Sequence, residues 1–141
     1  MIRKDTDNWI TPKSVYDELD REFHFDFDPC PYNPGEIVVD GLLVDWGNMN
    51  FVNPPYSPEL KLAFVLKAVD QKLRGRSSVL LIPAQTGTKL FHDVLLPNAD
   101  EIRFRKGRIQ FVKLDADGNT VKNKNGNPLD SMIVVFKADL F

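Results

Sequence analysis

Cysteine is nearly absent from this chain of 141 residues: Cys30 is its one thiol, so no disulfide can form within it. His24 and His92 are the two histidines, and no paired-thiol spacing accompanies them, so the ligands of a structural zinc site are missing and we expect no metal. No apolar run approaches the roughly 18 residues of a membrane helix. The opening MIRKDTDNW lacks the apolar core of a signal peptide. These absences predict an intracellular, cytoplasmic protein.

What is present suits one globular domain over residues 1–141, with 43% apolar and 27% charged residues. The net charge of -2 hides an asymmetry: residues 1–60 carry four Lys/Arg and twelve Asp/Glu, whereas residues 61–141 carry fourteen and eight. The basic half predicts either a phosphate-facing surface or solvated charge scattered over the molecule. Its clusters are Lys72, Arg74 and Arg76, and then Arg103, Arg105, Lys106 and Arg108.

Hydrophobic periodicity predicts helices that alternate with strands. Thr11 reads as an N-cap and Pro12 as the first residue of a helix that ends near Phe23, and Ser57 and Pro58 repeat this signal. The predicted strands are 23–28, 49–53, 77–83, 101–105, 108–114 and 131–137, and the further helices are 58–73 and 88–96. Residues 37–46 are predicted to hold one more short strand and its exit, with Gly41 leaving the boundaries open.

Residues 115–130, DADGNTVKNKNGNPLD, are polar and rich in Gly and Asn, which predicts a long hairpin loop between the last two strands. Such a loop either contacts a large partner or is surface slack. The whole pattern predicts an α/β fold, with helices on both faces of a mainly parallel sheet and an antiparallel C-terminal β-hairpin.

The motif NPPY, Asn53 to Tyr56, follows a compact apolar strand and precedes a capped helix. One reading is a rigid turn, because each proline fixes φ and disfavours helix in the residue before it. A second is a linear Asn-Pro-x-Tyr signal, which the apolar FV before it and the helix after it disfavour. In open α/β sheets, ligands bind beyond the carboxyl ends of strands, which is where this motif falls.

A third reading is chemical. The Asn53 side-chain carbonyl and the Pro54 backbone carbonyl are two acceptors that suit one amino group, and Tyr56 offers an aromatic face. When both protons of a nucleobase amino group are held in hydrogen bonds, its nitrogen becomes more tetrahedral, and the nitrogen lone pair can attack an electrophile. Stacking on an aromatic ring stabilises a base by about 1–3 kcal/mol. Pro54 and Pro55 would make the acceptor geometry rigid in advance.

With these residues the chain resembles the phage-type DNA N6-adenine methyltransferase family. The resemblance rests on WITP, FDFDPC, the DW before NPPYS, and GRIQF, in this order between Trp9 and Phe111. It implies a compact Rossmann-like methyltransferase fold, S-adenosylmethionine as methyl donor, DNA as partner and, for a phage-encoded protein, the host cytoplasm. The same motif chemistry also fits cytosine N4, an RNA adenine or a protein glutamine, and an inactive nucleic-acid-binding module would keep only the basic half.

The resemblance implies roles for individual residues. Asn53, Pro54 and Pro55 would hold the target amino group, and Tyr56 would stack on an extruded adenine. The implied cofactor-binding residues are Trp9, Thr11, Pro12, Asp28 and Asp45, with Asp40 as a weaker candidate for a ribose hydroxyl. Arg108 and Phe111 are candidates for substrate binding. The alternatives are a core tryptophan at Trp9, a turn cap at Asp28 and a solvated acid at Asp45.

One segment departs from the general methyltransferase pattern. A glycine-rich loop usually follows the first strand, but this chain has DPCPYNPG, with Gly35 as its one glycine. The argument that glycines let the backbone approach a bound dinucleotide closely therefore cannot be used to assign Cys30, Tyr32 and Asn33 to the cofactor site. Cys30 is expected to be packed, since methyl transfer needs no protein nucleophile.

Overall fold

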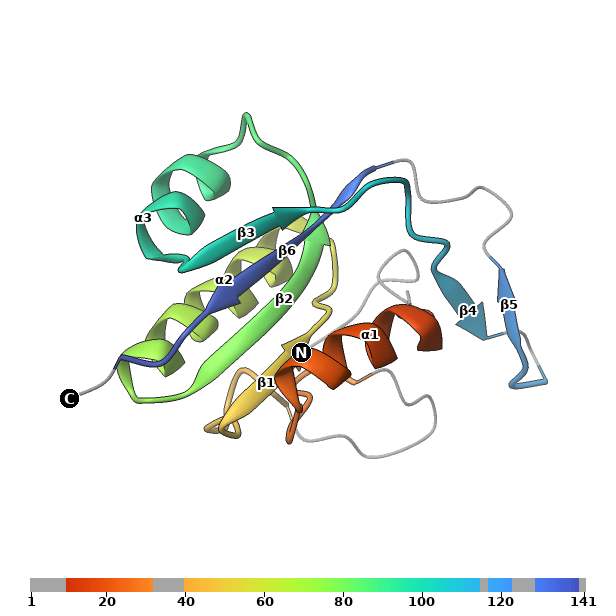
Figure 1. Ribbon diagram of the computed structural model, residues 1–141, viewed down its shortest axis with the longest axis horizontal. Coiled ribbons are helices and arrows are strands. Elements are labelled where there is room, and N and C mark those ends of the chain that lie inside the picture. The colour runs from red at the N-terminus through yellow and green to blue at the C-terminus, as the bar shows by residue number, and fades with distance from the viewer. Residues whose placement is uncertain (1–9, 32–39, 115–116, 123–128, 140–141) are drawn as a thin grey trace.

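The computed structural model describes residues 10–31, 40–114, 117–122 and 129–139 (Figure 1). Its helices are α1 (Lys13–Phe23), α2 (Pro58–Leu73), the π-helix η2 (Leu90–Leu95) and α3 (Leu96–Asn98). Its strands are β1 (Met49–Val52), β2 (Ser77–Pro83), β3 (Glu101–Phe104), β4 (Val112–Leu114), β5 (Thr120–Lys122) and β6 (Ser131–Phe136). Within these described ranges, no helix combines the length and the apolar character needed to cross a membrane.

The main sheet is mixed, in the order β1-β2-β6-β3. β1 and β2 are parallel, with Met49 opposite Ser77, whereas β6 is antiparallel to both β2 and β3. The prediction of an α/β protein is confirmed, but the mainly parallel sheet is not, because β6 inserts in the reverse direction between two strands that share an orientation. Hydrophobic pattern alone does not reveal such an insertion.

The predicted pairing of residues 108–114 with 131–137 is wrong. β4 pairs instead with β5, as a separate antiparallel two-stranded sheet that stands apart from the main sheet in Figure 1. β5 lies inside the segment predicted to be a loop, so the polar stretch contains part of its own hairpin. The strand expected from Arg108 begins at Val112.

Two helices cover opposite faces of the main sheet (Figure 1). Side chains of β2 alternate, so Val79 and Leu81 pack on the α1 side while Leu80 and Ile82 pack on the α2 side. The α1 core contains Val15, Leu19, Phe51, Val79, Leu81, Ile109, Phe111, Ile133 and Val135. The α2 core is built around Val52, Phe64, Val65, Ala68, Leu80, Ile82, Leu95, Val134 and Phe136. The helices on both faces that the sequence predicts are therefore present.

The two helix-start signals behave differently. α2 begins at Pro58 with Ser57 as N-cap, as predicted. α1 begins one residue later than predicted, at Lys13, with Pro12 in the N-cap position. Thr11 is therefore not the N-cap of α1, and its hydroxyl is available for another contact.

The segments before β1 contain less strand than predicted. In residues 23–28 the pairing is limited to a parallel bridge between Phe27 and Asn50. Of residues 37–46, the first three lie outside the described part, and Gly41 to Leu43 form a turn. The turn is anchored by Trp46, whose indole Nε1 donates to the Gly41 carbonyl at 2.8 Å.

Candidate active site at the carboxyl ends of two strands

A pocket of about 190 Å³ opens where β1 and the segment ending in Asp28 finish. The backbone N–H of Phe51 donates to the Phe27 carbonyl at 3.1 Å, so the two segments run side by side and release Asp28 and Asn53 at the same edge. We call this hollow the site pocket. It is lined by Ile10, Thr11, Tyr16, Asp28, Cys30, Pro31, Phe51 and Asn53.

Asn53 is held from two directions. Its Nδ2 donates to the Thr11 hydroxyl at 3.0 Å, and its backbone carbonyl accepts from the Cys30 thiol at 3.2 Å. Because the nitrogen side of the amide faces Thr11, the oxygen Oδ1 is the side-chain atom that can accept a hydrogen bond from a substrate amino group. Thr11 and Cys30 thus fix the orientation of the first NPPY residue.

Asp28 forms a carboxylate wall of the site pocket. Its Oδ1 accepts from the backbone N–H of Cys30 at 2.9 Å, which shapes a tight turn around the buried Pro29. Cys30 is 4% exposed and is a packed residue, as expected. The turn places the Asp28 carboxylate in the wall of the pocket that Asn53 also lines, and it brings the Cys30 thiol into contact with the Asn53 carbonyl.

The rest of the NPPY motif lies beside the pocket, with two buried prolines and a partly buried tyrosine. Pro54 and Pro55 are buried, and the Tyr56 hydroxyl donates to the Leu81 carbonyl at 3.3 Å. Burial, and then the nearby Cys30, raises the pKa of the Tyr56 phenol, so this group is neutral and is no general base near neutral pH. Its ring meets Phe111 edge-on, with centroids 6.0 Å apart.

The predicted site residues do not all meet. Thr11, Asp28 and Asn53 line the site pocket, whereas Asp45 is exposed at the strand-starting edge, 3.5 Å from Gln71 Nε2. Asp45 precedes β1, so the chain places it at the other end of that strand. Asp40 accepts from the Leu42 backbone N–H at 2.9 Å in the turn before β1.

Four more predicted residues take other positions. Trp9, like Tyr32 and Asn33, lies outside the described residues. Pro12 and the exposed Arg108 line a second hollow next to the site pocket. Phe111 is 2% exposed and belongs to the α1 core.

Two pocket residues had no signal in the sequence. Tyr16 lies on α1, and its ring contacts Phe51 edge-on with centroids 5.1 Å apart, so it forms an aromatic wall. Ile10 pairs with Val112 through two backbone hydrogen bonds of 2.8 and 3.1 Å. Both positions depend on how distant segments meet, which local patterns do not encode.

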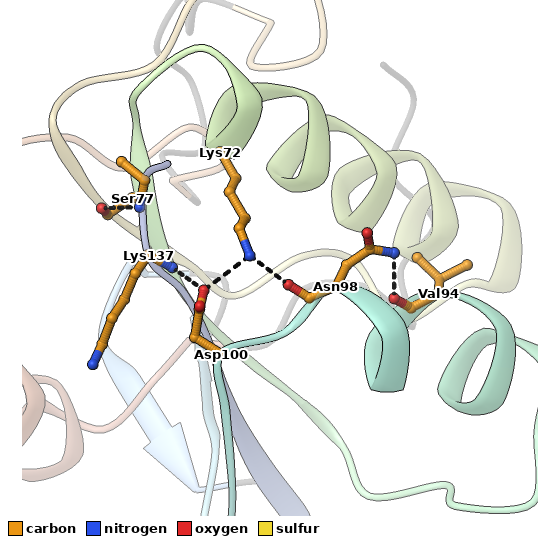
Figure 2. Close-up of polar contacts among 7 residues, drawn as sticks. Lys72, Ser77, Val94, Asn98, Asp100 and Lys137 are labelled. Atoms are coloured by element: carbon orange, nitrogen blue, oxygen red, sulfur yellow. Dashed lines mark hydrogen bonds and ion pairs between the residues drawn. The ribbon is translucent and has the colours of Figure 1, made fainter. Parts of the chain in front are cut away.

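The predicted basic clusters are largely engaged within the protein. Figure 2 shows Lys72 donating to the Asn98 carbonyl at 2.8 Å and to Asp100 at 3.1 Å, which ties α2 to the turn before β3. Arg74 pairs with Asp70 at 3.0 Å. The contacts of Lys72 support the fold, whereas Arg74 remains exposed in a surface pair within α2.

Arg103 is engaged in the same way. It bridges Glu22 of α1 and Glu101 of β3 at 2.6 and 2.5 Å. In the second basic cluster, Lys106 and Arg108 are therefore better placed than Arg103 to meet an external anion.

Comparison with known proteins gives a consistent result. The family model for DNA N-6-adenine-methyltransferases (Dam) matches residues 1–139. Among curated proteins, the DNA N-6-adenine-methyltransferase of Haemophilus phage HP1 (strain HP1c1) is 32% identical over 147 residues, which cover 96% of this chain and 81% of the relative. No solved structure matches the chain.

Proposed function

The chain belongs to the DNA N-6-adenine-methyltransferase family, and from this premise we propose that the site pocket is where the methyl donor and the target adenine meet. The protein is an adenine-specific DNA methyltransferase that acts at N6. The observation that carries the proposal is the Asn53 amide, fixed by Thr11 at the edge of the pocket.

S-adenosylmethionine, when bound, supplies an electrophilic methyl group on a sulfonium. The donor set of the site pocket suits such a molecule, since Asp28 and the Thr11 hydroxyl can accept from its amino and hydroxyl groups, and Tyr16 and Phe51 offer apolar rings. Complete small-molecule sites measure roughly 300–1,000 Å³, and this pocket measures about 190 Å³. We therefore assign it to part of the cofactor.

We also assign the fold to the Rossmann-like methyltransferase class. β1, β2 and β3 share one direction, and helices cover both faces of their sheet. Ligands in such open sheets bind beyond the carboxyl ends of the strands, and the site pocket lies beyond the end of β1.

The target amino group is assigned to Asn53 Oδ1 and the Pro54 carbonyl. When these two oxygens accept hydrogen bonds from both amino protons, the nitrogen lone pair is free for in-line attack on the methyl carbon. The bond from that carbon to sulfur would break as the new bond forms, and one amino proton would then be lost to solvent. The buried Pro54 and Pro55 hold the acceptors without a large ordering cost. Alignment of this kind can remove about 7–11 kcal/mol from a barrier, so the main task of these residues is positioning.

Tyr56 is assigned to stacking on the extruded adenine. Its hydroxyl is anchored on Leu81 and its ring is braced edge-on by the buried Phe111, so we assign Phe111 to support and not to direct contact. Taking a base out of a duplex costs a few kcal/mol, and a preset aromatic surface offsets part of that cost.

Methyl transfer tests the proposal. Purified protein, methyl-labelled S-adenosylmethionine and unmethylated DNA are incubated, and the DNA is digested to nucleosides for chromatography. We expect label in N6-methyladenine with the wild type and none with Asn53→Ala, which should still bind S-adenosylmethionine by calorimetry. The matched control is Asn48→Ala, an exposed asparagine before β1. Undiminished turnover by Asn53→Ala would remove the assigned role, and label in N4-methylcytosine or in RNA alone would reassign the target.

A further inference from the structure

A second hollow, of about 380 Å³, lies between the N-terminus of α1, the segment leading into β4, and β5. We call it the basic hollow. It is lined by Pro12, Ser14, Val15, Arg105, Lys106, Arg108, Ile109, Gln110, Val112 and Lys122. Four of these residues are cations and none is an acid, in a protein whose net charge is -2. The local field therefore opposes the overall charge and favours an anion.

Three of the four cations of the basic hollow are exposed. Lys106, Arg108 and Lys122 are exposed, and Arg108 lies 3.7 Å from the exposed Asp130, a surface pair of small worth. Arg105 pairs with Glu18 at 3.2 Å. Among the ion pairs of the described ranges, Lys106 and Lys122 take part in none.

The start of α1 adds to this field. The helix has 11 residues and no acid in its first turn, and Ser14 places a hydroxyl on the wall of the basic hollow. The start of a helix carries the positive end of its dipole. Here this partial charge supplements three exposed cationic side chains.

The basic hollow and the site pocket are neighbours. Thr11 lines the site pocket and Pro12 lines the basic hollow, and the Cα atoms of consecutive residues are about 3.8 Å apart. The pairing of Ile10 with Val112 holds this dividing segment against β4. A nucleic-acid strand that crosses residues 10–12 could therefore place a base in the site pocket and a neighbouring phosphate in the basic hollow.

We propose that the basic hollow binds the phosphate backbone of the substrate DNA beside the nucleotide whose adenine enters the site pocket. This inference rests on the proposed function, and it names the surface that holds the DNA. Contacts to phosphates position a protein on DNA without reading its sequence, so Lys106, Arg108 and Lys122 would contribute affinity and register but no base preference.

The test is the salt dependence of DNA binding by the double variant Lys106→Gln/Lys122→Gln, followed by fluorescence anisotropy. Each phosphate contact contributes about 0.9 to the slope of log K against log salt on duplex DNA, so we expect a slope shallower by about 2 and a weaker affinity for every duplex sequence. Lys106→Arg/Lys122→Arg should retain the wild-type slope. S-adenosylmethionine affinity should be unchanged in both.

The matched control is Lys67→Gln/Lys137→Gln, which removes the same charge from α2 and from the end of β6. An equal loss of slope in both double variants would mean that net charge alone acts, and would overturn the proposal. So would competition by inorganic phosphate beyond that of chloride at equal ionic strength, since the hollow would then be a free-phosphate site. The two proposals can also fail separately. If the wild type transfers no methyl group but its salt slope for DNA binding still depends on Lys106 and Lys122, the proposed function is contradicted and the basic hollow remains a DNA-binding surface.

Discussion

The hydroxyl of Thr11 accepts a hydrogen bond from the side-chain amide of Asn53 at 3.0 Å, across 42 residues of sequence. One residue precedes a helix and the other follows a strand, so the contact joins two layers of the fold at the edge of the site pocket. We therefore propose that Thr11 is a positioning residue, which acts on the reaction through the orientation of Asn53.

Thr11→Val should lower kcat by about tenfold, the equivalent of about 1.4 kcal/mol, because the isosteric side chain cannot hold the amide. Thr11→Ser keeps the hydroxyl and should restore most of the rate. Steady-state kinetics and thermal melting of both variants give the measurement. Equal kcat values for the valine and serine variants would show that the hydroxyl has no part in positioning.

Tyr56→Phe should lower the free energy of unfolding by about 0.5–1.5 kcal/mol near neutral pH, because the bond to the Leu81 carbonyl is lost. Burial raises the pKa of Tyr56 in the folded state above its ordinary value of 10.0. The unfolded chain therefore releases this proton first, and the stabilisation disappears as pH rises above about 10. Urea titrations at about pH 8 and pH 10.5 should show the two proteins converging; a constant difference would exclude the linkage.

Gly41→Ala should be severely destabilising, by more than about 3 kcal/mol. A Cβ at this position would lie 1.8 Å from the Pro29 carbonyl oxygen and 2.7 Å from the Pro29 carbonyl carbon. Both are backbone atoms of the turn between Asp28 and Cys30 at the site pocket. The control is Gly87→Ala, where a Cβ meets nothing within 4 Å. Urea unfolding followed by tryptophan fluorescence compares the two, and similar midpoints would mean that the close approach is relieved at little cost.

Arg103→Met should change the acid side of the stability profile. Hydrogen bonds from Arg103 lower the pKa values of Glu22 and Glu101 below their ordinary 4.5, so their stabilisation is present above that pH and is lost as pH falls through the folded values. The deficit of the variant should be largest near neutral pH and shrink below about pH 4.5.

Arg74→Met, which removes an exposed pair within α2, is the control for Arg103→Met. Urea midpoints across the acid range provide the measurement. A deficit of Arg103→Met that persists unchanged at low pH would assign its effect to packing over Phe23, whose ring centroid lies 5.3 Å from the guanidinium carbon.

The elements that could be predicted are those with a clear signal in the local sequence, such as an apolar run or a helix-start signal. The unbroken apolar run of β2 and the Ser57–Pro58 start of α2 both appear where expected. The partner of β6 could not be predicted, because strand pairing depends on tertiary packing and the buried apolar run from Met132 to Phe136 would suit several neighbours. The prediction of Thr11 as an N-cap was wrong for a related reason. The N-cap signal is local, whereas the hydrogen-bond partner of the Thr11 hydroxyl is Asn53, after β1.

The position of the site pocket could be predicted to the extent that it follows strand ends. Asn53 and Asp28 each come directly after a paired segment, and the structure brings them together as the rule for open sheets requires. The same rule would have separated Asp45, which precedes β1. Tyr16 in the site pocket and Lys122 in the basic hollow are placed by contacts between distant segments, for which one sequence offers no signal. Arg105, Lys106 and Arg108 belong to a basic cluster that the sequence shows.

The pairing of Ile10 with Val112 has a consequence for folding order. It joins two segments that are far apart in the sequence through one bridge, so its loop-closure entropy is offset only after both cores have formed. Local opening of residues 10–12 dismantles one wall of the site pocket and leaves the four-stranded sheet intact. On gradual heating, methyl transfer should therefore fail before the circular dichroism of the backbone changes.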